Sequence, residues 1–369
     1  MNGKQAGLVV GAAGVLAGVV GLGVLALPAG AGPAPVLPQV SAEQLVQSVL
    51  TTKTVPALAG TVSATNNLGL PAVPALGGQA SKFLTDGTTK AQVWTDGKGK
   101  GRVSLPGATS EETMVFDGTT LWDWTSQNNT VHKSTDTPEQ KAHPDKPGSG
   151  EMATDPAAAA KQIIALIDKD STVKVDGTAT VAGRPAYELV LAPKPTEKTL
   201  LREVRIAIDS ETKIPLQLSV LANGNAQPVA QIGFSTLQIA PQDPALFTFT
   251  PPAGANVVTG EDKKVADKAP DQLKNAAKPQ IVGSGWDTVL VEKLPAGTLG
   301  GDRSATTKGG ENFDPSKLLG QLGKRVSGPW GSGYEISTAV GTALVLDDGR
   351  IAVGAVPEQA LITALASVK

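Results

Sequence analysis

The sequence has 369 residues with 32 basic and 34 acidic side chains, so its formal net charge is −2. This balance gives no electrostatic support for nucleic-acid binding, because proteins that bind nucleic acids concentrate basic residues on one face. Cysteine is absent and histidine occurs twice, which excludes disulfides, thiol catalysis and cysteine metal sites and leaves almost no material for a Ser-His-Asp triad. We therefore expect no metal and no cofactor. A length of about 150 residues per domain predicts two domains.

The N-terminal segment predicts export. Ala6–Leu27 is a run of 22 residues without a polar side chain, which is long enough to cross a hydrocarbon core of about 30 Å. Lys4 precedes the run and no basic residue follows before Lys53, so the positive-inside rule leaves the N-terminus in the cytoplasm. Two interpretations stay open: a retained anchor in the cytoplasmic membrane, or a signal peptide cleaved after Ala31. Both place the rest of the chain outside the cytoplasm.

Composition divides the chain into successive segments. We expect a signal peptide or transmembrane anchor at 1–31, a Pro-rich spacer at 32–40, a large domain at 41–258, a charged linker at 259–280 and a small α+β domain at 281–369. The linker is charged and poor in large apolar residues, as is typical of segments without a core of their own.

The large domain begins with a helix and continues as strands. Ser41 and Gln44 fit a capping box, and the apolar residues that follow have helical spacing. A second helix is expected after Asp155, with Pro156 at its first position. Alternating apolar and polar residues then predict strands near 172–176, 187–191, 203–208, 216–220 and 232–239. Consecutive antiparallel strands with one apolar face predict a curved sheet, and the two helices are expected to cover its concave side.

Short hairpins are predicted between the first helix and the second. Asp96-Gly97 and Asp117-Gly118 separate short apolar runs, which is the turn chemistry of β-hairpins. Trp122 and Trp124 have the same parity on one of these strands, so they are expected on one face of the sheet.

The segment 66–81 (NNLGLPAVPALGGQAS) is apolar but interrupted by two prolines, so neither a regular helix nor a central strand fits it. It is either a lid or membrane-contacting loop, or a loop packed on its own core. Its candidate lid residues are Leu68, Leu70, Val73 and Leu76.

The C-terminal unit shows mixed patterns. Residues 286–293 predict a strand and 315–326 predict a helix. The turn Asp348-Gly349 between two apolar runs predicts a hairpin, and Pro357 begins a terminal helix.

Catalytic motifs are not found. Adjacent acidic residues such as Glu111-Glu112 point apart on a strand, so they do not form an acid–base pair. The sequence contains no GxxxxGK[ST] phosphate loop, and no GxGxxG follows a strand. A large sheet without a polar constellation is typical of a binding protein, so we expect no enzyme activity.

An ordered set of segments carries a family resemblance. SAEQLVQSVL, NNLGLPAVPAL, MVFDGTTLWDWTSQNNTVHK, GRPAYELVLAPK, IDSETKIPLQL and FTFTPPAGANV follow one another between Ser41 and Val258. Together they resemble the exported LolA-like proteins of high-GC Gram-positive bacteria, a superfamily that includes the outer-membrane lipoprotein carrier LolA and the sigma-E regulator RseB (MucB). The resemblance implies an α+β fold: an unclosed antiparallel half β-barrel with covering helices, followed here by the small C-terminal α+β domain.

The same resemblance implies a ligand and a partner. The ligand would be the acyl chains of a lipid or lipoprotein, bound without catalysis in an apolar cavity. The alternative is a membrane-tethered regulator like RseB in a sigma/anti-sigma envelope-stress pathway, which would act through protein–protein contacts with a membrane protein partner. Matching strand positions give the candidate lining as Trp94, Val103, Leu105, Met114, Phe116, Trp122, Trp124, Leu189, Leu191, Val204, Ile206, Leu216, Leu218 and Phe234.

Overall fold

The computed structural model describes residues 34–52, 54–69, 87–107, 109–135, 164–259, 279–294, 305–306, 312–313 and 315–368. The expected anchor at 6–27, most of the linker, most of the second helix and the loop residues Leu70, Val73 and Leu76 lie outside the described residues.

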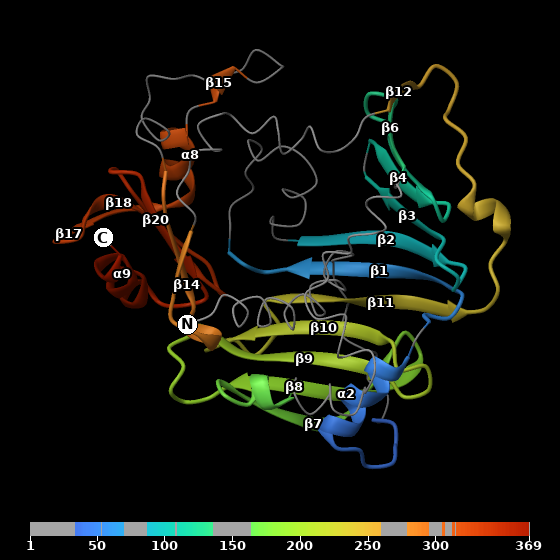
Figure 1. The fold of residues 1–369 in the computed structure, drawn as a ribbon, viewed down its shortest axis with the longest axis horizontal. Coiled ribbons are helices and arrows are strands. Elements are labelled where there is room, and N and C mark those ends of the chain that lie inside the picture. Colours follow the sequence, from blue (N-terminus) through green and yellow to red (C-terminus); the bar gives the residue numbers. More distant parts are fainter. Residues whose placement is uncertain are drawn as a thin grey trace.

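A twelve-stranded sheet dominates the fold (Figure 1). Its spatial order is β12-β6-β5-β4-β3-β2-β1-β11-β10-β9-β8-β7. Neighbouring strands are antiparallel except β12 and β6, which pair in parallel. β12 and β7 end the sheet without pairing to each other, so the sheet is unclosed, as expected. The strands are β1 (Leu58–Asn66), β2 (Gly87–Thr95), β3 (Gly101–Pro106), β4 (Glu111–Phe116), β5 (Thr120–Thr125), β6 (Thr130–Thr135), β7 (Ser171–Val181), β8 (Arg184–Pro193), β9 (Leu201–Asp209), β10 (Pro215–Ala222), β11 (Ala230–Ile239) and β12 (Asn256–Thr259).

The predicted turn chemistry explains the short hairpins. Between β4 and β5, Gly118 has a φ of 102°, a conformation that glycine adopts without steric cost. The carboxylate of Asp117 accepts hydrogen bonds from the backbone N–H groups of Thr119 at 3.0 Å and Thr120 at 2.8 Å. This Asp-Gly turn therefore fixes the register in which β4 and β5 pair.

One helix covers part of the sheet. α2 (Ala42–Thr51) begins with the predicted capping box, because Ser41 Oγ accepts from the N–H of Gln44 and the Gln44 side chain accepts from the N–H of Ser41. Leu45 of α2 is 2% exposed and packs in a cluster with Leu189, Ile206 and neighbouring side chains of β8 and β9. We call the face of the sheet that α2 covers the inner face, and the opposite face the outer face.

A long connection crosses the outer face. The segment 240–255 joins β11 to β12 and contains the short 3₁₀ helix η1 (Pro244–Phe247). Figure 1 shows it running outside the curve of the sheet. β11 ends at Ile239, so Phe247 and Phe249 lie beyond it in this connection. Asp243 then caps η1, with its side chain accepting from the N–H of Ala245. We call the segment 240–255 the strap.

The C-terminal domain is a second, smaller α+β unit. Its sheet has the order β13-β14-β20-β19-β18-β17. The core forms where α9 packs against β14, β19 and β20, with Leu344, Leu346, Leu361 and Leu365 all at most 1% exposed. The elements are β13 (Gln280–Val282), η2 (Gly285–Asp287), β14 (Val289–Lys293), α8 (Pro315–Leu322), β17 (Lys324–Gly328), β18 (Gly331–Ser337), β19 (Thr342–Leu346), β20 (Arg350–Gly354) and α9 (Glu358–Ser367), with β15 (Ala305–Thr306) and β16 (Asn312–Phe313) pairing separately.

Two elements of this domain differ from the sequence expectation. The helix expected over 315–326 ends at Leu322, because Gly323 approaches β18 so closely that a Cβ there would lie 2.7 Å from the carbonyl oxygen of Glu335. The strand expected from 286 begins only at Val289. Gly283 and Gly285 before it both have positive φ, and η2 forms there instead.

Candidate ligand-binding face

The inner face carries an apolar row in each half of the sheet. In one half, Val93 of β2 pairs with Val103 of β3, which pairs with Met114 of β4. In the other half, Ile232 of β11 pairs with Leu218 of β10. Because directly paired residues point to the same face, each set shares one surface. Ile206 and Leu189 continue the second set across β9 and β8.

Ten of the fourteen expected lining residues lie on this face. Three of them, Leu189, Leu191 and Ile206, are buried beneath α2. The remaining seven are half-buried, so this part of the face keeps apolar surface accessible. They are Val103, Leu105, Met114, Phe116, Val204, Leu218 and Phe234.

Phe234 shows how closely the inner face is packed at its centre. Its ring lies over Gly60 of β1, where a Cβ would come within 2.9 Å of the ring and 2.5 Å of the carbonyl oxygen of Thr236. The ring of Phe234 can lie against β1 only because residue 60 is a glycine and has no Cβ. Leu216, also expected in the lining, follows a register irregularity in β10 and is 1% exposed in the cluster around Leu58 and Val62.

The apolar row ends in a polar rim. Asp123 of β5 pairs with Met114 on one side and with His132 of β6 on the other. Burial raises the pKa of Asp123, and the nearby His132 opposes that rise only in part. The inner face is therefore apolar from β9 to β4 and becomes mainly polar at β5 and β6, where Leu121 beside Phe116 is the apolar exception.

The three tryptophans of the expected lining lie on the outer face. Trp94 pairs with Arg102, which pairs with Val115 and then with Trp122. This row alternates with the row of Met114, so it points the other way. Trp122 and Trp124 do share a face, as expected, but the strap and not a cavity lies beside them. The three tryptophans therefore lie on the opposite side of the sheet from the ten expected lining residues of the inner face.

Specific contacts hold the tryptophans beneath the strap. The ring centroids of Trp122 and Phe249 are 5.6 Å apart, and Lys133 Nζ lies 4.8 Å from the Trp122 ring centroid. Trp124 donates its indole N–H to the Asn129 side chain at 3.2 Å, and Asn129 donates to the carbonyl oxygen of Ala253 at 3.3 Å. Two of these contacts are structural, because the Phe249 ring and the bond from Asn129 to Ala253 fasten the strap to β5 and to the β5–β6 turn.

Beyond the strap the outer face is charged. Arg205 of β9 contacts Glu203 at 2.8 Å, Glu188 at 3.3 Å and Asp176 at 3.9 Å. Burial raises the pKa of Glu188, and the charge of Arg205 opposes that rise. Across β7–β9 the inner face is thus apolar, whereas the outer face carries these ion pairs.

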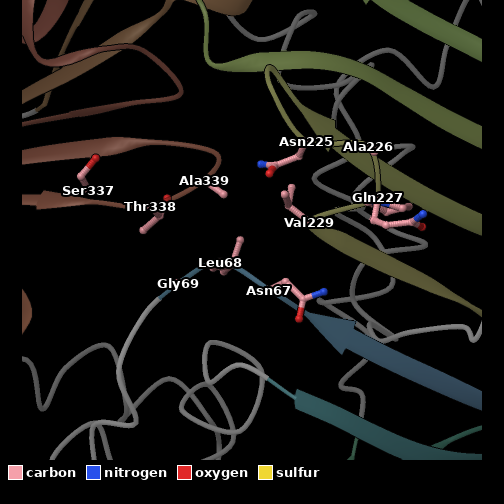
Figure 2. Close-up of a pocket in the computed structure, with 11 residues that line it drawn as sticks. Asn67, Leu68, Gly69, Asn225, Ala226, Gln227, Val229, Ser337, Thr338 and Ala339 are labelled. Atoms are coloured by element: carbon pink, nitrogen blue, oxygen red, sulfur yellow. The ribbon is translucent and has the colours of Figure 1, made fainter.

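Leu68 of the candidate lid lies between the two domains. Its carbonyl oxygen accepts a hydrogen bond from the backbone N–H of Ala339 at 3.0 Å. Figure 2 shows Leu68 opposite Ala339 and Val229, around a pocket of about 550 Å³. The β10–β11 turn supplies Asn225 to this pocket. Leu68 therefore contributes to the domain junction.

Two other kinds of site are absent from the described residues. Within these residues, His, Asp and Glu side chains form no group of three that could hold a metal ion. Of the helices in the described ranges, none has the length and apolarity needed to cross a membrane.

Several solved structures are similar to this chain. A complex of Pseudomonas aeruginosa MucA and MucB matches with 17% identity and a TM-score of 0.41, covering 88% of this chain and 96% of that chain. A crystal structure of MucB matches with 16% identity and a TM-score of 0.37, covering 86% and 94%. A LolA superfamily protein from Nitrosomonas europaea matches with 10% identity and a TM-score of 0.21, covering 57% and 99%.

The described strands form one open, mainly antiparallel sheet followed by a smaller α+β unit, which is the fold that the resemblance led us to expect. No protein-family model matches the sequence, and no curated protein matches it. Because these identities are below 25% and the TM-scores below 0.5, the likeness assigns neither a ligand nor a partner to this chain.

Sequence reasoning missed one residue of the inner face. Trp286 was expected in a strand of the C-terminal domain, yet its side chain packs against the cluster of Leu45, Leu189 and Ile206. One feature of the sequence could have corrected this prediction. Trp286 directly follows Gly283-Ser284-Gly285, and a segment so rich in glycine is unfavourable for a strand.

Proposed function

We propose that this chain is an extracytoplasmic protein that holds the acyl chains of a lipid or lipoprotein on the inner face, without catalysing a reaction. The half-buried apolar row around Met114, Leu218 and Phe234 carries this proposal. Burial of an acyl chain on such a surface contributes about 0.8 kcal/mol per methylene. The polar rim at Asp123 and His132 gives a hydrated headgroup a place at the end of the row.

The extracytoplasmic location is part of the proposal. It rests on the charge asymmetry around residues 6–27, with Lys4 on one side and no basic residue before Lys53 on the other. Whether carrier or sensor, the protein would then meet lipid on the outer side of the cytoplasmic membrane. Cleavage after Ala31 would release it, and retention would keep it at that membrane.

The test compares two substitutions on neighbouring strands. Leu218→Asp places a charge on the inner face, whereas Gln231→Asp places one on the outer face, next to Ile232, the partner of Leu218. A displaceable fluorescent fatty acid reports binding. We expect Leu218→Asp to weaken binding at least tenfold and Gln231→Asp to leave it unchanged. Equal binding by wild type and a folded Leu218→Asp variant would overturn the proposal.

A second candidate function is a membrane-tethered regulator that acts through protein contacts. It is favoured by an exposed apolar row on the C-terminal sheet, opposite α9: Ile281 is 56%, Leu290 43% and Val353 42% exposed. The register places these three side by side across β13, β14 and β20. Exposed apolar rows of this kind are typical of interaction surfaces. Affinity capture from membranes with wild type and Leu290→Asp tests it: loss of one specific membrane protein would support it, and identical captured proteins would contradict it.

A further inference from the structure

The C-terminal domain contributes one side chain to the inner face. Trp286 lies in η2, yet its ring packs against the inner-face cluster of Leu189, Leu191 and Ile206. Its indole N–H donates to Ser171 Oγ at 2.6 Å, and its backbone N–H donates to the Glu197 carboxylate at 2.9 Å. Because Ser171 begins β7, the indole closes the inner face at that end of the strands.

The backbone before Trp286 has a conformation that lets the C-terminal domain come close to the start of β7. Gly285 has a φ of 66°, and a Cβ there would lie 2.5 Å from the Cβ of Asp170. No other residue fits both the backbone conformation and the close contact. The backbone N–H of Ser284 donates to the Asp287 carboxylate at 3.4 Å across η2. The position of the Trp286 ring is therefore fixed by its own turn as well as by its partners on β7.

The other described contacts between the two domains lie away from the inner face. Ala355 accepts hydrogen bonds from the backbone N–H of Leu200 at 2.8 Å and from Thr199 Oγ1 at 2.7 Å. A further hydrogen bond between the domains runs from the backbone N–H of Ala339 to the carbonyl oxygen of Leu68. In Figure 1, β14 and β20 stand beside the ends of β9 and β10. In the described part of the chain, Trp286 is thus the side chain through which this domain packs against the inner-face cluster.

We propose that Trp286 is the end wall of the acyl-binding face and sets the longest acyl chain that the protein holds, an inference that rests on the proposed function. An acyl chain that extends along the half-buried part of the inner face past Leu218 and Val204 reaches the indole ring, which packs against the same cluster. Further methylenes must stay in water or displace the ring from Ser171. Chain length is then limited by a residue of the second domain.

The experiment measures the affinity of saturated fatty acids of increasing length by competition with a fluorescent fatty acid, using the full chain. For the wild type, each added methylene should tighten binding about fourfold until the affinity reaches a plateau. In Trp286→Ala we expect the plateau to move to chains longer by about two carbon atoms or more, because the substitution leaves a cavity. Trp286→Phe keeps a smaller ring and should give an intermediate shift.

Thr199→Ala is the matched control, because it loosens the contact with Ala355 without touching the ring. Its plateau should stay at the wild-type length. An unchanged plateau in folded Trp286→Ala and Trp286→Phe variants would overturn the inference, and so would an equal shift in Thr199→Ala, which would assign the effect to domain docking. Absence of fatty-acid binding by every protein would instead overturn the proposed function, and the inference with it.

Discussion

The rings of Trp122 and Phe249 lie with their centroids 5.6 Å apart and their planes tilted by 34°. This contact joins β5 to the strap across more than a hundred residues of sequence. Because the strap crosses the outer face, this contact shows that Trp122 points to the outer face. The aromatic residues that gave the sequence its clearest apolar signal therefore fasten the outer layer of the sheet and leave the inner face to aliphatic residues, Met114 and phenylalanine.

Removal of the strap aromatics should cost stability without affecting ligand binding. Phe247 is 2% exposed, so Phe247→Ala should lower the free energy of unfolding by about 3–5 kcal/mol. Phe249 is only half-buried, so Phe249→Ala should cost about 1–2 kcal/mol, including the lost ring contact. Urea denaturation measures both changes. Loss of fatty-acid affinity in the folded Phe249→Ala variant would contradict the assignment of this contact to the outer face.

Asp209 predicts an acid dependence of stability. Its side chain is fully buried; burial alone would raise its pKa, but Arg184 at 2.6 Å and the N–H and hydroxyl of Thr212 hold the pKa below its usual value. A lowered folded-state pKa means that this stabilisation is complete above about pH 4 and is lost as the pH falls through the folded-state value. Asp209→Asn should cost about 2–4 kcal/mol at pH 7.

The pH profile separates Asp209 from the exposed carboxylates. The wild type should lose stability below pH of about 4, and Asp209→Asn should show a flatter profile because the titrating group is gone. Glu43→Gln removes an exposed carboxylate of α2 and serves as control, with a profile close to that of the wild type. Equal slopes in the wild type and Asp209→Asn would show that the bond to Arg184 does not carry the acid dependence.

Gly285→Ala should loosen the contact between the domains. A Cβ at this position meets Asp170 and must also adopt positive φ, which alone costs about 1–2 kcal/mol. Hydrogen exchange should become faster at the backbone N–H of Leu200, which bonds to Ala355 across the junction, while the C-terminal sheet stays protected. Gly183→Ala is the control: its φ is 78° but no atom lies within 4 Å of the added Cβ. Unchanged exchange at Leu200 in Gly285→Ala would contradict this account.

Much of the fold follows from local patterns. The alternation in 187–191, 203–208 and 216–220 predicted β8, β9 and β10, and the Asp-Gly turns predicted the hairpins, because one sheet face is apolar and the turn residues fix the register. The helix at Ser41 and its capping box were likewise predicted, since cap and spacing are encoded within four residues. An unclosed sheet was expected from the family resemblance.

The choice of face could not be predicted. Parity placed Trp122 with Trp124, but only the strap, which follows more than a hundred residues later, shows that their face is the outer one. The register shift between Thr61 and Val62 likewise changes which residues of β11 meet β1, and no pattern in the sequence marks it. Trp286 was missed for the same reason: its partner Ser171 lies 115 residues away in the other domain.

The most direct measurement of the central claim is native mass spectrometry of the full chain, exported from a bacterial host and purified without detergent. The account predicts a stoichiometric adduct that extracts into organic solvent, fragments as a lipid, and is lost in Leu218→Asp but kept in Gln231→Asp. A single mass equal to that of the protein alone would contradict an acyl-binding inner face and would favour the regulator that acts through the C-terminal sheet.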